Sequence, residues 1–304
     1  MYPLQASYGK ETYDSWEKSH ANDLSGTVRD WQFADHNPWN VKSFSELLHA
    51  VAFLGSMNKR LTLFYRGQAK DLDPLPVLFR DSWWCSQSKR SFNLTWKNRE
   101  GYWNELSKIG SLVFEICHKL GVPRWRGLKD IREVQWSVIQ HYGLWPTPLI
   151  DLTSSLRVAA SFALSLKLGN PNNPNAGFLY VLGMPYSTGS ISYSVDENIV
   201  LARLQSACPP IAKRPHYQEG FLVGRFPLYF PDKEAGDKSR LKRRLVAKFA
   251  LHDEGSFWND NFPLVKEDAL LPTDDALIDE LSKKLGPGKQ YSIERLAMQL
   301  ENGS

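Results

Sequence analysis

Apolar residues recur every three to four positions in several stretches of the chain, which predicts helices. The stretch SFSELLHAVAFLG is the clearest, because Ser43 can cap its first turn and Glu46 stands three residues further on. The same period returns over residues 101–121 and 130–142. Gly143 is expected to end the latter helix, because glycine readily adopts the left-handed conformation found there.

Shorter apolar runs bounded by turn residues predict strands. These runs are LTLFYRGQ (61–68), LIDLT (149–153), GFLYVLGM (177–184), the end of HYQEGFLVGRF (216–226) and RRLVAKFALH (243–252). Further helices are expected over residues 197–207, 274–286 and 292–300, and after Ser154 or Ser155, where the small residues of SLRVAASFAL allow close packing. Helices and strands alternate irregularly, so the sequence predicts a mixed α+β fold rather than a doubly wound sheet.

Residues 1–40 are polar with scattered aromatics and show no period, which indicates an irregular arm that could contact a partner. Residues 41–304 are expected to form one domain, without internal repeats or low-complexity linkers. The start has no basic and apolar leader, and no run approaches the roughly 18 apolar residues of a membrane helix. A cytoplasmic protein without a membrane contact is therefore the expectation.

Charge and cysteine content narrow the classes further. The 304 residues carry a net charge of +4, which permits an anionic partner without requiring one. The three cysteines are scattered without metal-ligand spacing, so no metal site is expected. No GxGxxG, GxxxxGK[ST], GxSxG or HExxH motif occurs, which argues against kinases, P-loop NTPases, common serine hydrolases and zincins.

Polar residues at predicted strand ends are the candidates for chemistry. Arg66 follows an apolar strand, where a guanidinium could donate to a phosphate or a ribose oxygen, although a surface salt bridge is equally open. Gly67 would let a ligand approach the backbone. Asp151 lies in an apolar run and needs hydrogen-bond donors, which the preceding loop or His141 could supply. We favour a structural anchor for both residues over a general base and a catalytic histidine.

The stretch Thr153-Ser154-Ser155 joins a predicted strand to a predicted helix. One hydroxyl is expected to cap the helix, which leaves two that could face a cleft near the positive helix end. Gln218 and Glu219 precede a strand, where either could bond a ribose hydroxyl or steady a developing cation. Successive side chains of a strand point to opposite faces, so only one of the two is expected to face a cleft.

Together these pieces resemble the FRG domain family. The resemblance rests on FYRGQ (64–68), QHYGLWPTPLIDLTSS (140–155), VAASFA (158–163) and QEGF (218–221), and it covers the chain from about Val41 to the last helix. One departure is Trp145, which stands between Leu144 and Pro146 and lengthens the loop by one residue.

More remotely, the order of these motifs resembles the Arg, Ser-Thr-Ser and Glu layout of ADP-ribosyltransferases. That resemblance implies a largely antiparallel split sheet flanked by helices and an enzyme that transfers ADP-ribose from NAD. It implies catalytic roles for Arg66 and for Gln218 or Glu219. The NAD-binding residues that it implies are Arg66, Gly67, Gln68, His141, Tyr142, Thr153, Ser154 and Ser155.

The acceptor of ADP-ribose is left open between RNA, DNA and protein. The basic run Lys238–Lys248 and the pair Trp83-Trp84 would suit phosphate contact and base stacking, whereas a solvated strand edge also explains the basic run. Related bacterial domains act as toxins and in phage defence, so an intracellular toxin held by an antitoxin protein is the implied setting. The alternatives are a catalytically inactive module that binds a nucleotide or a partner, and an NAD glycohydrolase.

Overall fold

The computed structural model describes residues 38–76, 96–123, 125–164, 176–226, 241, 244–272 and 274–285. The chain forms two compact units, each assembled from three segments. Unit 1 comprises Met1–Pro74, Leu152–Tyr186 and Phe230–Leu271. Unit 2 comprises Leu75–Asp151, Ser187–Tyr229 and Pro272–Ser304.

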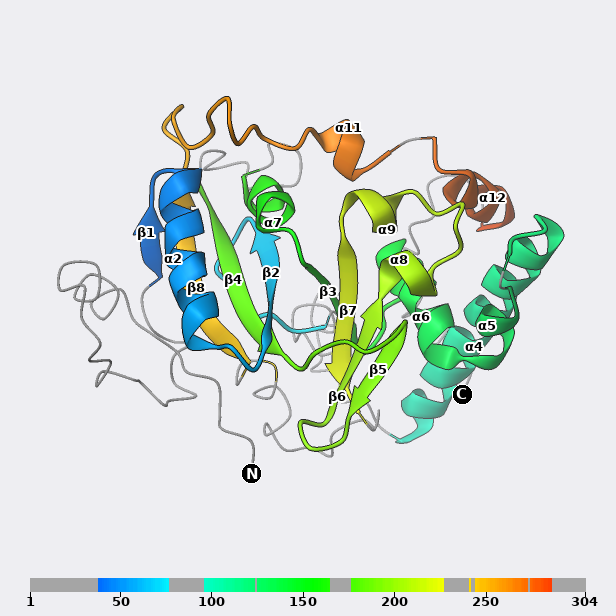
Figure 1. Ribbon diagram of the computed structural model, residues 1–304. Coiled ribbons are helices and arrows are strands. Elements are labelled where there is room, and N and C mark those ends of the chain that lie inside the picture. Colours follow the sequence, from blue (N-terminus) through cyan, green and yellow to red (C-terminus); the bar gives the residue numbers. More distant parts are fainter. Residues whose placement is uncertain are drawn as a thin grey trace. The chain divides into compact units, whose positions relative to one another are not determined.

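The strands of unit 1 pair in the order β1-β8-β4-β2 (Figure 1). Their bounds are Trp39–Val41 for β1, Leu245–His252 for β8, Ala176–Met184 for β4 and Thr62–Gln68 for β2. Strand β1 pairs with β8 in parallel, and the other pairs are antiparallel. Strand β3 (Leu149–Thr153) contributes its last two residues to this unit, where Thr153 lies opposite Tyr65 of β2.

Helices α2 (Phe44–Met57) and α7 (Leu156–Ala163) cover one face of these strands. Both helices share a buried apolar cluster with Leu179 of β4 and Phe249 of β8. The Ser43 side chain accepts the Glu46 N–H at the start of α2, as the capping pattern predicted. The short helix α11 (Glu267–Leu270) follows the last strand of the unit.

Unit 2 contains an antiparallel meander of β5 (Ile191–Ser194), β6 (Ile199–Arg203) and β7 (Gly220–Arg225). Its longer helices are α4 (Trp96–Lys119), α5 (Trp125–Asp130), α6 (Arg132–His141) and α12 (Ala276–Leu285). Two single-turn helices, α8 (Leu204–Ala207) and α9 (Arg214–Tyr217), stand between β6 and β7. The expected α+β class and the largely antiparallel pairing are confirmed.

The sequence prediction for residues 197–207 is wrong. Residues 197–207 were expected to form a helix, but they form strand β6 followed by only one helical turn, α8. Ile199, Val200 and Leu201 are all buried, so both faces of β6 are covered, and β5 and β7 pair with its two edges. A strand buried on both faces shows no alternation of apolar and polar residues, so its pattern resembles that of a buried helix.

Several predictions lie outside the described residues. These are the arm up to residue 37, the Trp83-Trp84 pair, residues 238–240, 242 and 243 of the basic run, and the last helix. The expected arm boundary is wrong at its end, because Trp39 and Asn40 form strand β1 with Val41. Among the described residues, no helix is long and apolar enough to cross a bilayer.

Candidate functional site

Arg66 lies near the end of β2, opposite Tyr180 of β4. Its guanidinium Nε donates to Gln68 Oε1 at 3.2 Å, and the Gln68 amide donates to the carbonyl of Leu72. Arg66 and Gln68 are both half-buried. Residues two apart in a strand share a face, so Gln68 is placed to orient the arginine fork.

Gly67 faces the opposite side of the strand, toward helix α7. A Cβ at Gly67 would stand 1.8 Å from the Ala159 carbonyl oxygen. A Cβ at Gly177 of β4 would likewise stand 2.2 Å from the Ala163 carbonyl oxygen. The close approach that Gly67 allows is therefore that of a helix, and the predicted tight packing of the alanine-rich helix is confirmed.

The hydroxyls of Thr153 and Ser155 shape the junction between β3 and α7. Ser155 is the N-cap of α7, and its Oγ accepts the Val158 N–H at 3.5 Å. Thr153 is buried, and its Oγ1 accepts the Ser155 N–H at 3.0 Å. Two hydroxyls were expected to remain for a cleft, but Ser154 is the exposed one of the three.

In unit 2, the QHYG segment and the start of β3 form one hydrogen-bonded network around Asp151. His141 Nδ1 lies 3.2 Å from Asp151 Oδ1, and Gln140 Nε2 donates to Asp151 Oδ2 at 2.9 Å. Thr147 Oγ1 donates to the side-chain oxygen Gln140 Oε1 at 2.6 Å and accepts the Leu149 N–H. The expected anchoring of Asp151 by His141 is confirmed, and Gln140 and Thr147 are partners that sequence reasoning missed.

This network also orients the ring of His141. The side chain of His141 is 3% exposed. A carboxylate only accepts hydrogen bonds, so the Asp151 contact favours the tautomer with the proton on Nδ1. The buried Nε2 has no hydrogen-bond partner among the described residues. In this tautomer Nε2 is the acceptor nitrogen of the ring, on the side opposite Asp151.

The loop after α6 is held in place by backbone and aromatic contacts. Gly143 has φ +63°, and the N–H groups of Gly143 and Leu144 bond the carbonyls of Gln140 and Ile139. This is the Schellman pattern of a helix end, so the predicted stop at Gly143 is confirmed. The inserted Trp145 is buried, and its ring stacks 6.4 Å from that of Tyr102 in α4. The extra residue thus anchors the loop on α4.

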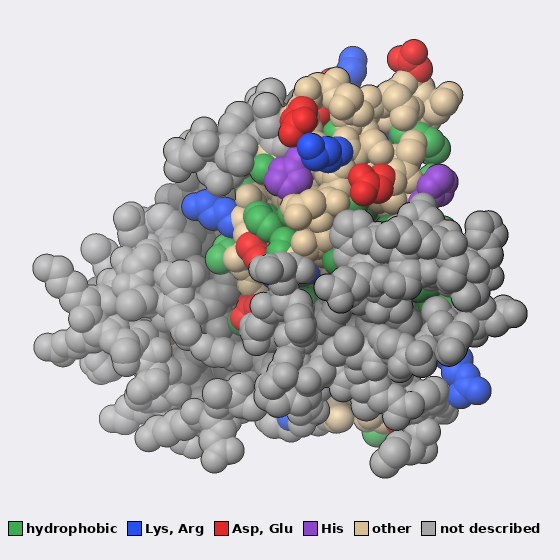
Figure 2. Space-filling view, turned by 90° about the vertical axis from the view of Figure 1, so that its left-hand side faces the viewer, with side chains coloured by type: hydrophobic (Ala, Val, Ile, Leu, Met, Phe, Trp, Pro, Cys, Tyr) green, Lys and Arg blue, Asp and Glu red, His purple; other side chains and the backbone are tan. Residues whose placement is uncertain are grey.

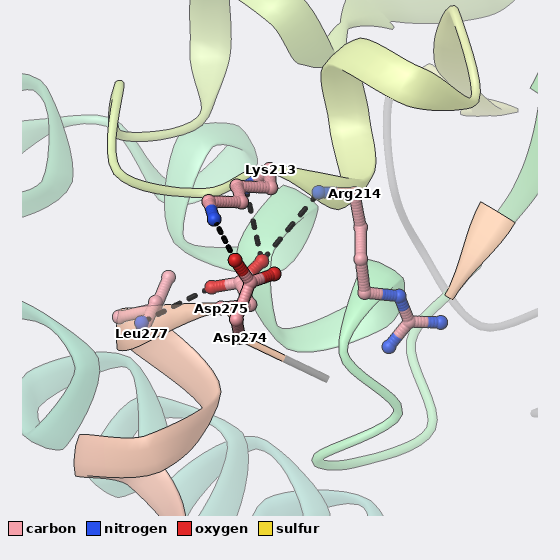
Figure 3. A network of polar contacts seen from close by, with 5 residues as sticks. All are labelled: Lys213, Arg214, Asp274, Asp275 and Leu277. Atoms are coloured by element: carbon pink, nitrogen blue, oxygen red, sulfur yellow. Dashed lines mark hydrogen bonds and ion pairs between the residues drawn. The ribbon is translucent and has the colours of Figure 1, made fainter. Parts of the chain in front are cut away.

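Tyr142 is part of a second network in unit 2, centred on the fully buried Asp275. Asp275 accepts from Tyr142 OH at 2.7 Å, from the Lys213 and Arg214 N–H groups, and from the Leu277 N–H (Figure 3). Burial and the Asp275 hydrogen bond raise the pKa of Tyr142. Tyr142 was expected to bind NAD, but its hydroxyl is engaged in this internal bond.

Arg214 lies at the start of α9, and sequence reasoning did not single it out. Its guanidinium carbon lies 5.4 Å from the centre of the Tyr142 ring, within the range of a cation–π contact. In Figure 3 its side chain points away from Asp275, although its backbone N–H faces that carboxylate. Burial lowers the pKa of Arg214, opposed by Tyr142, Asp151 and Asp275.

Gln218 and Glu219 lie in the turn between α9 and β7, and they directly precede the strand as expected. Gln218 is buried and has helical backbone angles. Glu219 is exposed and has φ +45°, in the left-handed region. The alternation of side chains along a strand therefore does not decide which of the two could face a cleft. Their exposure distinguishes them, because Glu219 is exposed and Gln218 is buried.

Lys248 is the described end of the basic run, and it is not at a solvated strand edge. It lies inside β8, between β1 and β4, and is 6% exposed. A lysine in the otherwise apolar run LVAKFALH was a signal that sequence reasoning could have used. On the described part of the face in Figure 2, side chains of both charge signs lie near one another.

The predicted site residues are divided between the two units. Unit 1 holds Arg66, Gly67, Gln68, Thr153, Ser154 and Ser155. Unit 2 holds His141, Tyr142, Gln218 and Glu219. Within the described ranges, no group of three His, Cys, Asp or Glu side chains is arranged to hold a metal ion.

A comparison with protein families matches one of them. The family model of the FRG domain matches residues 62–170, which include the FYRGQ motif, the Asp151 network and the β3–α7 junction. No curated protein and no solved structure matches the chain. The resemblance predicted from the motifs is confirmed over residues 62–170, which match the FRG domain.

Proposed function

We propose that the protein is an ADP-ribosyltransferase-like enzyme that transfers ADP-ribose from NAD to a macromolecule, either a nucleic acid or a protein. Arg66 would bind the phosphate or ribose of NAD, and Glu219 would stabilise the developing ribosyl cation. Its setting as a cytoplasmic toxin in phage defence, with an antitoxin partner, stays a prediction.

The observation that carries this proposal is the backbone of Glu219. A left-handed conformation costs about 1–2 kcal/mol for a residue with a Cβ, and helix ends normally place glycine or asparagine there. Among the described residues, Asn198 and Glu219 are the non-glycine residues with positive φ, and asparagine tolerates this region. An exposed glutamate kept in a strained turn, at the position that the resemblance assigns to catalysis, is typical of a functional site.

Two further features support the proposal. Gln68 holds the Arg66 fork at the end of a strand, which favours bidentate binding of an anion. Ser154 is exposed at the strand-to-helix junction that Thr153 and Ser155 shape.

The reaction requires few ionisable groups. The bond between the ribose C1′ and the nicotinamide nitrogen breaks, and neutral nicotinamide leaves with the bonding electrons. A nucleophile of the acceptor then bonds to C1′ and loses its proton to solvent or a nearby base. A carboxylate near the cation and an arginine on the phosphates supply orientation and electrostatic stabilisation, which are the main requirements of such a step.

Arg66→Ala is expected to lower transfer of labelled ADP-ribose by about 100-fold or more, the usual effect of losing a charge-stabilising donor. The assay incubates the purified protein with labelled NAD and a lysate divided into protein and RNA fractions. Arg60→Ala, which removes an exposed arginine of the same unit, serves as the control and should retain full activity. Label in one fraction names the acceptor class.

Other outcomes of this assay contradict the transferase. Nicotinamide released without any macromolecule, and no label in either fraction, would identify an NAD glycohydrolase. If NAD stays intact although every variant is folded, the protein is instead a module that binds a nucleotide or a partner.

Glu219→Gly is expected to raise stability by about 0.5–1 kcal/mol while transfer activity falls. The gain is the relieved left-handed strain minus the extra chain entropy of glycine in the unfolded state. Urea denaturation measures the gain, and the labelled-NAD assay measures the loss. Asn198→Gly is the matched control, with a smaller gain and unchanged activity. Activity that survives Glu219→Gly would remove Glu219 from the catalytic role.

A further inference from the structure

A row of polar side chains crosses three strands of unit 1. Arg66 of β2 lies opposite Tyr180 of β4, and Tyr180 lies opposite Lys248 of β8. Residues directly opposite one another in neighbouring strands point to the same face. Strands are about 4.8 Å apart, so the Cα atoms of Arg66 and Lys248 are about 10 Å apart, within joint reach of one ligand.

This row lies on the face away from α7. The next residues along the three strands, Gly67, Leu179 and Phe249, pair with one another in the same way. Gly67 contacts α7, and Leu179 and Phe249 belong to the apolar cluster with that helix. The side chains of the row therefore point to the other face of the strands.

Asp71, just after β2, accepts hydrogen bonds from Tyr180 and Lys248 of this row. Lys248 Nζ donates to Asp71 Oδ2 at 2.8 Å, and Tyr180 OH donates to Asp71 Oδ1 at 2.6 Å. The Lys248 side chain is 8% exposed, whereas that of Asp71 is 41% exposed. Burial and the Asp71 bond raise the pKa of Tyr180. The lysine is thus fixed inside the sheet while its counter-ion reaches the surface.

The fold itself does not explain a lysine at this position. Burying a charged pair generally adds little stability compared with apolar residues of similar size, because desolvation offsets the attraction. The neighbours of Lys248 in β8, Ala247 and Phe249, are fully buried and apolar. Lys248 is a second cation on the face that carries Arg66. A ligand with more than one negative charge, bound on that face, would explain its presence.

We propose that Lys248 and Arg66 form a diphosphate-binding pair on this face of unit 1, with Asp71 as the resident counter-ion of Lys248. The ligand class is a nucleoside diphosphate derivative, here the pyrophosphate of NAD or ADP-ribose. The inference rests on the proposed function and adds to it a phosphate subsite. Asp71 repels the incoming phosphates and competes with them for Lys248, so it lowers their affinity.

The test is calorimetric titration of the full chain with ADP-ribose and, separately, with inorganic pyrophosphate. Lys248→Met is expected to weaken ADP-ribose binding about 10-fold or more, because it removes a charged hydrogen bond of about 1.5–3 kcal/mol. Asp71→Asn is expected to strengthen binding several-fold. Lys248→Arg keeps the charge and should retain most of the affinity. Lys42→Met removes a lysine that is 70% exposed and should change nothing.

The two substitutions are expected to change the affinity for ADP-ribose in opposite directions, which distinguishes this subsite from a structural ion pair. If the pair is only structural, Lys248→Met and Asp71→Asn both lower the melting temperature and leave the affinity unchanged, and that result would overturn the inference. A wild-type protein that binds neither probe would also overturn it. Opposite shifts without label transfer would keep the subsite and refute the transferase. Label transfer with an affinity that neither substitution changes would refute the subsite alone.

Discussion

Replacing Gly67 by alanine is expected to lower the free energy of unfolding by about 3 kcal/mol or more, at the upper end of overpacking effects. The added Cβ would stand 1.8 Å from the Ala159 carbonyl oxygen and 2.8 Å from the Ala163 nitrogen. Both are backbone atoms of α7 that no rotamer change can move away. The helix would have to shift as a body and lose its packing in the apolar cluster of unit 1.

The matched control is the same substitution in α2 of the same unit. A Cβ at Gly55 meets only Leu63 Cδ1 at 3.7 Å, an ordinary contact. Alanine is the better helix former, so Gly55→Ala should raise stability by about 0.5–1 kcal/mol. Urea denaturation of both variants measures the difference. Equal stability of Gly67→Ala and the wild type would mean that α7 does not approach β2 closely enough to exclude a Cβ.

Local signals of the sequence predicted local structure well. Ser43 with Glu46 marked the start of α2, and Gly143 marked the end of α6, because a cap is determined by residues within one helical turn of it. The His141–Asp151 contact was also foreseeable, since the two residues are ten apart in a compact motif.

Long-range pairing could not be predicted in the same way. Lys248 and Asp71 are 177 residues apart, and Tyr142 and Asp275 are 133 apart. Such pairs follow from strand order and helix packing, which one sequence does not reveal. The strain at Glu219 was hidden for another reason, because a φ of +45° has no compositional signal when the residue is neither glycine nor asparagine.

The family match covers some of the proposed site residues and not others. The motifs of the FRG domain include Arg66 and the β3–α7 junction, and the family match covers them. Glu219 and Lys248 lie beyond residue 170, so their proposed roles depend on backbone conformation and cross-strand register. The experiments on these two residues therefore test chemistry that the family match does not address.

Asp275→Ala is expected to be the most destabilising change in unit 2, with a loss of about 3–5 kcal/mol in the free energy of unfolding. The alanine would leave the Tyr142 hydroxyl and the N–H groups of Lys213 and Leu277 without their acceptor. Each buried donor left unsatisfied costs about 1–3 kcal/mol. These donors come from α6, α9 and α12, so one carboxylate joins three helix ends.

Asp274 offers the control one residue away. Its side chain is 72% exposed and contacts Lys213 Nζ at the surface (Figure 3). A single exposed ion pair contributes little, so Asp274→Ala should leave the urea midpoint unchanged. A similar loss for both variants would mean that surface charge, and not the buried acceptor, stabilises this corner.

The Asp275→Ala result also bears on function, because α9 leads directly into the strained turn at Glu219, and strain persists only where the surrounding structure holds it. A stable Asp275→Ala protein that keeps full transfer activity would show that this anchor does not hold the turn.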